Sequence, residues 1–195
     1  YVLRYLTRPF VKRPQRAKQR FSEAVASKQF TEDWFDNRIP VWEEKLLFNT
    51  DPEILEIGSF EGRSTLFFLT HFPSSRVTVI DAWGIAAGDD SYEKQKRFDE
   101  VERRFDSNMQ DYLDRIVKHR GRSSTLLGQL HGQKYDLIYI DGSHYSLDVM
   151  ADAVLSWPLL KEDGFMVFDD YFWIDPQYGT AKSPCKAINL FLSLV

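Results

Sequence analysis

The stretch that decides the fold is EILEIGSFEGRST, residues 53–65. It begins as a short apolar run and continues, after a turn, into a segment whose apolar residues have helical spacing. Gly58 and Gly62 lie four positions apart, so the backbone can turn sharply and a ligand can approach the opening of the helix. We predict a buried strand, a tight turn and a helix. The turn is either a ligand site or only a close connection between the two elements.

The same rhythm continues along the chain. Further strands are expected at 76–81, 115–121, 135–141 and 164–170, and helices at 61–72, 91–113, 123–130, 145–157 and 183–195. In the helix at 145–157, one apolar face is predicted from the spacing of Leu147, Met150, Val154 and Trp157. Short apolar strands that alternate with helices are typical of a parallel sheet buried on both faces. The sequence therefore predicts an α/β fold, a doubly wound (Rossmann-like), mostly parallel sheet with helices on both faces.

The N-terminal part differs in character from the rest. Residues 1–20 carry seven basic side chains and no acid, whereas the net charge of the whole chain is −4. From about residue 20 to 48 aromatic residues recur at helical spacing, and Pro40 interrupts them. We expect two short helices that cover one side of the sheet, preceded by a basic arm. The arm is a solvated tail, a first helix, a targeting remnant or a contact for an anionic surface. The predicted division is 1–48 for the arm and helical cap and 49–195 for the ligand-binding domain.

Composition narrows the class of protein. Of the 195 residues, 43% are apolar and 28% are charged, which is typical of a globular domain. No apolar run reaches the ~20 residues of a membrane-spanning helix. A single cysteine, Cys185, excludes an internal disulfide and fits a reducing compartment, so we expect a cytoplasmic protein. The acidic balance outside the arm argues against a nucleic-acid-binding domain, which would present a basic face.

Glycine or polar residues follow every expected strand. In parallel α/β sheets, ligands bind outside the carboxyl ends of the strands. The residues at these positions are Gly58, Asp81, Gly121–Ser123, Asp141–His144 and Asp169–Asp170. We expect them to line one ligand site.

The first turn favours one class of ligand. A dinucleotide fingerprint would carry a glycine where this chain has Phe60, so NAD and FAD are disfavoured. Asp81 ends the second strand, where a carboxylate can accept hydrogen bonds from both hydroxyls of a ribose. A ribose without a pyrophosphate indicates S-adenosylmethionine. Alternatively, Asp81 caps a helix and the glycines only form a turn.

A resemblance to the class I S-adenosylmethionine-dependent methyltransferases is carried by EILEIGSFEGRST, VTVIDAWG and YDLIYIDGSHYSLDVMADAVLSWPLLKEDGFMVFDDYFW. It covers roughly residues 50–175. The branch that it resembles most has Asp-Gly-Ser-His after strand four and a paired-acid DDY after strand five, and includes metal-dependent sugar O-methyltransferases of macrolide biosynthesis. The resemblance implies a set of cofactor-binding residues: Glu56, Gly58, Ser59 and Gly62 at the methionine end, Asp81 at the ribose, and Arg122 and Ser123 beside the adenine.

The same resemblance implies a divalent cation, Mg²⁺ or Mn²⁺, bound by Asp141, Asp169 and Asp170. Neighbouring strands lie ~4.8 Å apart, so strands four and five would bring these carboxylates together, and oxygen ligands suit such a cation. His144 would be the general base for an acceptor hydroxyl, whose pKa the cation lowers. Related metal-dependent members often have Glu-Asp or Asp-Asn where this chain has Asp-Asp, and the shorter first carboxylate could loosen one ligand. In the alternative interpretation, Asp169 and Asp170 cap a turn and His144 faces solvent.

These observations leave two functions open. The first is an O-methyltransferase that acts on a hydroxyl of a small molecule or sugar. The alternative is a non-catalytic cofactor-binding domain with a scaffold or assembly role. Aromatic segments at 83–92 and 171–178 are expected to form walls of the acceptor pocket. The family's sheet usually ends in an antiparallel hairpin, whereas this chain stops at LFLSLV. We therefore expect either missing C-terminal strands or a sheet edge covered by a partner, such as a second copy in a homo-oligomer.

Overall fold

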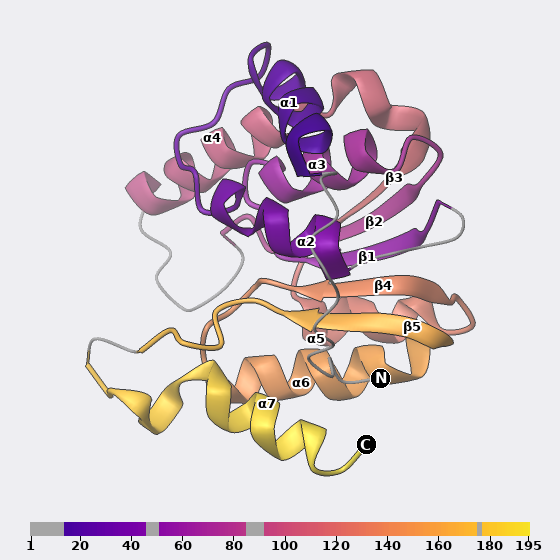
Figure 1. Cartoon of the computed structure of the whole chain (residues 1–195). Coiled ribbons are helices and arrows are strands. Elements are labelled where there is room, and N and C mark those ends of the chain that lie inside the picture. The colour runs from indigo at the N-terminus through magenta and orange to yellow at the C-terminus, as the bar shows by residue number, and fades with distance from the viewer. Residues whose placement is uncertain (1–13, 46–50, 85–91, 175–176) are drawn as a thin grey trace.

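A computed structural model describes residues 14–45, 51–84, 92–174 and 177–195 of the chain (Figure 1). Its strands are β1 (Glu53–Ile57), β2 (Arg76–Asp81), β3 (Ile116–Arg120), β4 (Tyr135–Ile140) and β5 (Leu160–Phe168). Its α-helices are α1 (Pro14–Val25), α2 (Ile39–Lys45), α3 (Arg63–His71), α4 (Tyr92–Asn108), α5 (Ser123–Leu126), α6 (Ser146–Ser156) and α7 (Pro184–Leu192). Short 3₁₀ helices are η1 (Asp36–Arg38), η2 (Gln110–Arg115), η3 (Leu127–Leu130), η4 (Trp157–Leu159) and η5 (Thr180–Lys182). Every strand expected from the sequence is present, and β5 begins earlier than expected.

The strands form one parallel sheet with the order β3-β2-β1-β4-β5. This arrangement confirms the predicted α/β fold. At the end of β1, Ile57 lies opposite Ile80 of β2 on one side and Ile140 of β4 on the other. The chain therefore builds the sheet in one direction through β2 and β3 and in the other direction through β4 and β5. The carboxyl ends of β1 and β4 mark the switch point, where sheets of this kind bind ligands.

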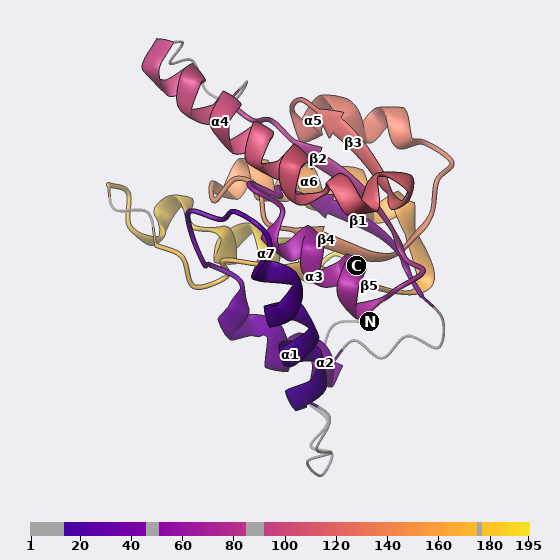
Figure 2. The ribbon, with the colours of Figure 1, turned by 90° about the horizontal axis from the view of Figure 1, so that it is seen from above.

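Helices cover both faces of the sheet, with α1 to α4 on one face and α5 to α7 on the other (Figures 1 and 2). Successive residues of a strand point to opposite faces. Ile54 accordingly packs into a core that includes Phe21 of α1 and Trp42 of α2, whereas its neighbour Leu55 packs into a core with Phe191 of α7. The two N-terminal helices thus share a core with the sheet. Within the described ranges, no helix has both the length and the apolar character needed to cross a membrane.

Two helices differ from expectation in detail. Pro40 does not interrupt a helix but is the second residue of α2, where proline is tolerated because the first turn leaves its N–H groups without helical partners. In α6 the predicted apolar face is wrong, since Leu147 is 84% exposed. The helix instead buries Val149 and Ala153. Both sets of residues have helical spacing, so the spacing alone could not select the buried one.

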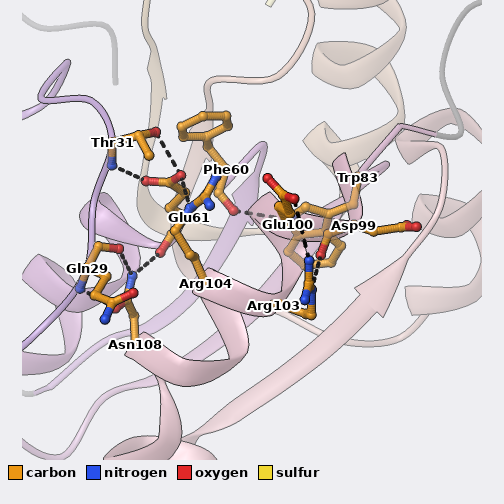
Figure 3. A network of polar contacts seen from close by, with 10 residues as sticks. All are labelled: Gln29, Thr31, Phe60, Glu61, Trp83, Asp99, Glu100, Arg103, Arg104 and Asn108. Atoms are coloured by element: carbon orange, nitrogen blue, oxygen red, sulfur yellow. Dashed lines mark hydrogen bonds and ion pairs between the residues drawn. The ribbon is translucent and has the colours of Figure 1, made fainter. Parts of the chain in front are cut away.

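A polar network fastens the segment that follows α1 to the first turn of the fold (Figure 3). We call residues 28–45 the cap. The buried carboxylate of Glu61 accepts hydrogen bonds from the N–H (2.6 Å) and the hydroxyl (2.8 Å) of Thr31, and it pairs with Arg104 of α4. Asn108 bonds the backbone of the cap and also the carbonyl of Glu61. The network holds the cap beside the carboxyl ends of the strands. The predicted basic arm lies mostly before residue 14, outside the described residues.

Candidate functional site

A cavity of about 960 Å³ lies at the carboxyl ends of the strands. Its lining includes a residue at the end of each of the five strands, namely Gly58, Asp81, Gly121, Asp141 and Asp169. Side chains of the cap between residues 30 and 38 line it as well. The structure therefore brings the strand ends singled out in the sequence to one cavity and adds a wall that the sequence did not indicate.

The first turn touches the end of β4 directly. Gly58 has a φ of +85°, and a Cβ at this position would lie 2.3 Å from the carbonyl oxygen of Asp141. Only glycine satisfies both the backbone angle and the close approach. Gly62 has a φ of +83° at the start of α3. Between them, Ser59 lines the cavity, and its buried Oγ has no hydrogen-bond partner among the described residues. A buried hydroxyl of this kind is suited to a ligand.

Asp81 lies on the wall of the cavity beside the first turn. Its Oδ2 accepts hydrogen bonds from the N–H groups of Ser59 (2.8 Å) and Phe60 (2.9 Å), and its Oδ1 accepts one from Trp83 (2.8 Å). A carboxylate has about four acceptor positions, so three backbone donors leave limited capacity for a ribose. Asp81 therefore organises the turn through these amides, none of which belongs to a helix, so it does not cap a helix as the alternative interpretation proposed. Its contact with a ribose stays a prediction.

Glu56 lies deeper than expected. It is fully buried in β1, it is not part of the cavity lining, and it accepts hydrogen bonds from the hydroxyls of Ser64 and Thr65 of α3. Burial raises the pKa of Glu56 to about 7, even though the two hydroxyls favour the ionised form. Ser64, unlike Glu56, lines the cavity. Glu56 is placed to support the first turn through α3, and a direct contact with a ligand stays a prediction.

The third strand end contributes Arg122 and Ser123, which both line the cavity. Ser123 hydrogen-bonds Asp152 of α6, which also lines the cavity and which no sequence motif indicated. Burial and, to a smaller extent, the charge of Asp148 raise the pKa of Asp152 to about 6, although the hydrogen bond with Ser123 acts in the opposite direction. An acid on the buried face of an apolar helix would have indicated Asp152. The prediction placed the buried face of α6 on the wrong residues, so Asp152 was left outside the expected buried face.

Three acids gather at the ends of β4 and β5. One carboxylate oxygen each of Asp141, Asp169 and Asp170 lies within 4.8 Å of the others. Burial, followed by the charge of Asp169, raises the pKa of Asp141 well above its usual value, and the hydroxyl of Tyr139 lies 2.8 Å from Asp141 Oδ2. Asp170 has a φ of +51°, which is unusual for a residue other than glycine. Such a cluster is favourable only with positive charge or shared protons between the carboxylates.

Positive charge for this cluster comes from the cap. Arg38 Nε lies 2.7 Å from Asp169 Oδ1, and Arg38 Nη2 lies 3.8 Å from Asp170 Oδ1. Burial raises the pKa of Asp169, and the Arg38 charge acts in the opposite direction. No sequence pattern indicated Arg38, because it belongs to a segment far from both acids along the chain.

His144 lies on the other side of Asp170. Its Nδ1 is 2.8 Å from Asp170 Oδ2, and its ring packs on Trp173 with 5.1 Å between centroids. The hydrogen bond from His144 lowers the pKa of Asp170. With Nδ1 donating to Asp170, Nε2 is the nitrogen able to accept a proton. The imidazole is thus oriented by a carboxylate, as bases often are in active sites.

Among the described residues, one aromatic side chain from each of the two predicted aromatic segments lines the cavity, whereas Tyr171, Phe172 and Tyr178 do not. Trp83 is buried and donates from Nε1 to the carbonyl of Phe60 (2.9 Å), and Trp173 lies at the acid cluster. The cap adds Trp34, whose ring is 5.0 Å from that of Phe60. Residues 85–91 and 175–176, which belong to the two predicted aromatic segments, lie outside the described residues.

Sequence comparisons give a family and a relative. Residues 55–171 match the model of a family described as "Methyltransferase domain". The O-methyltransferase hkm8 of Aspergillus hancockii is 31% identical over 121 residues, which are 62% of this chain and 43% of that protein. The chain therefore aligns with less than half of the length of this relative.

Solved structures of methyltransferases share the fold. SAH-bound PaMTH1 of Podospora anserina matches with a TM-score of 0.53 and 16% identity, covering 96% of this chain and 89% of that chain. An O-methyltransferase from Bacillus cereus in complex with SAH gives a TM-score of 0.58 at 18% identity, with 92% and 78% covered. MycE of the mycinamycin biosynthetic pathway, in complex with Mg, SAH and mycinamycin VI, gives 0.57 at 18% identity, with 90% and 44% covered.

Proposed function

Because the chain belongs to the methyltransferase domain family, we propose that it is an S-adenosylmethionine-dependent O-methyltransferase acting on a hydroxyl of a small molecule or sugar. The resemblance inferred from the motifs is confirmed at the level of the family. The observation that carries the proposal is the cavity at the switch point, which lies within the matched region and joins the glycine turn to a carboxylate cluster. Binding of SAH by two neighbours of the same fold supports the choice of cofactor.

For the cofactor, we assign the end of the cavity formed by β1, β2 and β3. The unpartnered hydroxyl of Ser59 and the close backbone at Gly58 support a ligand at the first turn. The proposed binding residues are Gly58, Ser59, Asp81, Arg122 and Ser123, which line the cavity, with Glu56 as a support beneath Ser64. Gly62, also predicted to bind the cofactor, is not part of the lining; a Cβ there would lie 2.9 Å from the ring of Phe105, so its role is to let α3 begin close to α4. Asp152 joins this set through its hydrogen bond with Ser123.

For a divalent cation, the residues at the other end are a suitable set. Asp141, Asp169 and Asp170 offer only carboxylate oxygens, which Mg²⁺ and Mn²⁺ prefer, and these oxygens converge within 4.8 Å. Burial and, after it, the charge of Asp169 raise the pKa of Asp141, and a cation would relieve the repulsion between the two carboxylates. A bound cation would supply positive charge that lowers the pKa of an acceptor hydroxyl. A cation in the MycE complex is consistent with this assignment.

The chain's own residues accept the proton of the acceptor hydroxyl and orient the imidazole that takes it. The acceptor oxygen attacks the methyl carbon in line with the sulfonium, so an oxygen–carbon bond forms while the carbon–sulfur bond breaks and leaves a neutral thioether. The proton of the hydroxyl passes to Nε2 of His144, while Asp170 holds Nδ1 and stabilises the imidazolium that forms. Trp173 fixes the plane of the imidazole by packing on it. Holding the reactants in this geometry supplies a large part of the rate enhancement.

For the acceptor, we assign the space between the cap and the acid cluster. Trp34 and Phe60 on one side and Trp173 on the other provide flat apolar surfaces. Aromatic faces of this kind bind rings, either the apolar face of a sugar or a phenol.

The proposal is tested by separating binding from transfer. Calorimetry with SAH should detect binding, and labelled S-adenosylmethionine should transfer its methyl group to at least one member of a panel of sugar and phenol acceptors. Excess chelator should abolish transfer, and Mg²⁺ or Mn²⁺ should restore it. Asp169→Asn should require more cation for half-maximal rate, whereas the matched Asp163→Asn, on an exposed part of β5, should not.

Each failure has a distinct meaning. Absence of SAH binding would contradict the assigned cofactor. Binding of SAH without transfer to any acceptor would favour the scaffold alternative. Full activity in excess chelator would leave the three acids as a structural cluster and His144 as the sole aid to proton removal.

A further inference from the structure

Arg38 is the cap residue that reaches the acid cluster. Its backbone is anchored on both sides, because Phe35 and Ile39 are buried in the core shared with the sheet. Next to it, Asp36 receives a two-point hydrogen bond from Arg63 of α3, at 2.8 and 2.7 Å. The segment therefore presents the Arg38 side chain from a fixed base, and the guanidinium reaches the cluster from outside the sheet.

The guanidinium and His144 divide the oxygens of the paired acids. Arg38 faces Oδ1 of Asp169 and, at longer range, Oδ1 of Asp170. His144 holds Oδ2 of Asp170. The Asp170 oxygen left for a cation is therefore the one that faces Arg38. A cation bound to Asp169 Oδ1 and Asp170 Oδ1 would need the space that the guanidinium fills.

Electrostatic repulsion also opposes the presence of both the Arg38 guanidinium and a divalent cation at the acid cluster. The guanidinium of Arg38, with Nε 2.7 Å from Asp169 Oδ1, already places one positive charge beside the oxygen that a cation would bind. A guanidinium within hydrogen-bond reach of a divalent ion repels it, because two positive charges ~4 Å apart in a partly buried setting are only weakly screened. The arginine is about one third exposed and long enough to turn away into the cavity that it lines. The charges therefore favour either the guanidinium or the divalent cation at these carboxylates, and not both together.

We propose that Arg38 is a tethered competitor of the divalent cation: it neutralises Asp169 and Asp170 in the cation-free protein and must leave Asp169 when the cation binds. This inference rests on the cation site of the proposed function. Because the backbone carbonyl of Trp34 accepts a hydrogen bond from Arg38, displacement of the guanidinium loosens the cap wall of the acceptor space. Cation binding and order in residues 34–38 are then thermodynamically linked, and each weakens the other.

The test compares cation affinity in matched variants. Calorimetric titration with Mn²⁺ or Mg²⁺ should give a Kd about tenfold lower for Arg38→Gln than for the wild type, since one repulsive charge at close range is removed. Arg38→Lys, which keeps the charge without the fork, should lie between the two. The control is Lys28→Gln, which makes the same change in net charge at a cap residue that pairs with the distant Asp111. Its Kd should stay within about twofold of the wild type if screening by salt suppresses remote charges.

A second readout follows the cap. Hydrogen exchange of the amides at residues 34–38 should speed up when the wild type is titrated with cation, and should be fast from the start in Arg38→Gln. Equal or weaker cation affinity in a folded Arg38→Gln protein would overturn the proposal, as would exchange that slows on cation binding. Absence of cation binding in every variant would overturn it too. None of these results depends on methyl transfer, which is measured separately, so a failure of the proposed enzyme activity is distinguishable.

Discussion

The two ends of the cavity satisfy their acids in different ways. At the cofactor end, Asp81 accepts three N–H groups from the first turn and from its own loop, and Glu56 accepts two hydroxyls from the helix that follows the turn. At the acid end, Asp169 and Asp170 depend on Arg38 from the cap and on His144. The first end is therefore built by neighbouring backbone, and the second by side chains that only the folded chain brings together.

The two ends of the cavity therefore differ in rigidity and in the way their negative charge is balanced. Backbone donors fixed by a glycine turn cannot move far, so the cofactor end is suited to hold one ligand shape. The acid end has a surplus of carboxylates and one arginine, whose side chain is about one third exposed, so its charge can be balanced in more than one way. We expect changes at the acid end to alter rate and cation affinity, and changes at the cofactor end to alter stability and cofactor affinity.

The largest effect is expected from removing the imidazole at the acid end of the cavity. His144→Ala should lower kcat by about 10²–10⁴, the usual contribution of a positioned proton acceptor. Affinity for SAH should change little, because the ring contacts Asp170 and Trp173 and not the first turn. The wild-type rate should fall on acidification, since a protonated imidazole cannot accept a proton. Steady-state kinetics across pH, with the exposed His131→Ala as control, checks this prediction. A loss below about threefold with an unchanged pH profile would assign proton removal to another group.

The second prediction concerns Glu56 at the cofactor end, where we expect the effect to appear in the free energy of unfolding. Its pKa is about 7 in the folded protein, against 4.5 for an ordinary glutamate. Between these values the folded state holds a proton that the unfolded state has released, so stability falls as pH rises through about 7. The side chain of the Glu56→Gln variant cannot titrate, so the variant lacks the part of this loss of stability that Glu56 causes. From pH 5 to pH 8 the wild type should therefore lose about 2–3 kcal/mol more than the variant.

Urea unfolding at the two pH values measures this difference. The raised pKa of Asp152 acts in the same direction in both proteins and cancels in the comparison. The contribution of Asp141 cancels only in part, because the charge of Glu56 is one of the smaller causes that raise the pKa of Asp141. Parallel pH dependence of wild type and variant would mean that Glu56 is ionised throughout, held by the hydroxyls of Ser64 and Thr65.

The smallest effect tests Asp81. Asp81→Ala should weaken SAH binding by about 1.5–3 kcal/mol, the cost of losing hydrogen bonds to a charged group. It should also lower the melting temperature without ligand, because Ser59 and Phe60 lose their acceptor. Asp81→Asn keeps one acceptor oxygen and should spare more stability than affinity if the ribose contact is real. Calorimetry and thermal melts on both variants separate the two roles, and an unchanged SAH affinity in both would remove the ribose assignment.

Much of the fold was predictable because it rests on local pattern. The five expected strands end at glycine or an acid, and parallel strands carry such ends to one edge of the sheet. Gly58 was identified from its place in a motif, and the structure adds the contact with Asp141 that makes a side chain intolerable there. The buried face of α6 was not predictable, because two sets of residues share helical spacing and only the neighbouring core selects between them. Asp152 was missed for the same reason.

The sequence by itself determined the parallel sheet, the glycine turn and the acids at strand ends, because each depends on residues adjacent along the chain. Only the tertiary structure decided how those acids are balanced. Glu56 proved to be a buried support, Asp81 a cap for the turn, and Arg38 the positive charge beside Asp169. The physical reason is that an ion pair depends on distance in space, and the spacing of residues along a chain carries no information about a partner delivered by a remote segment.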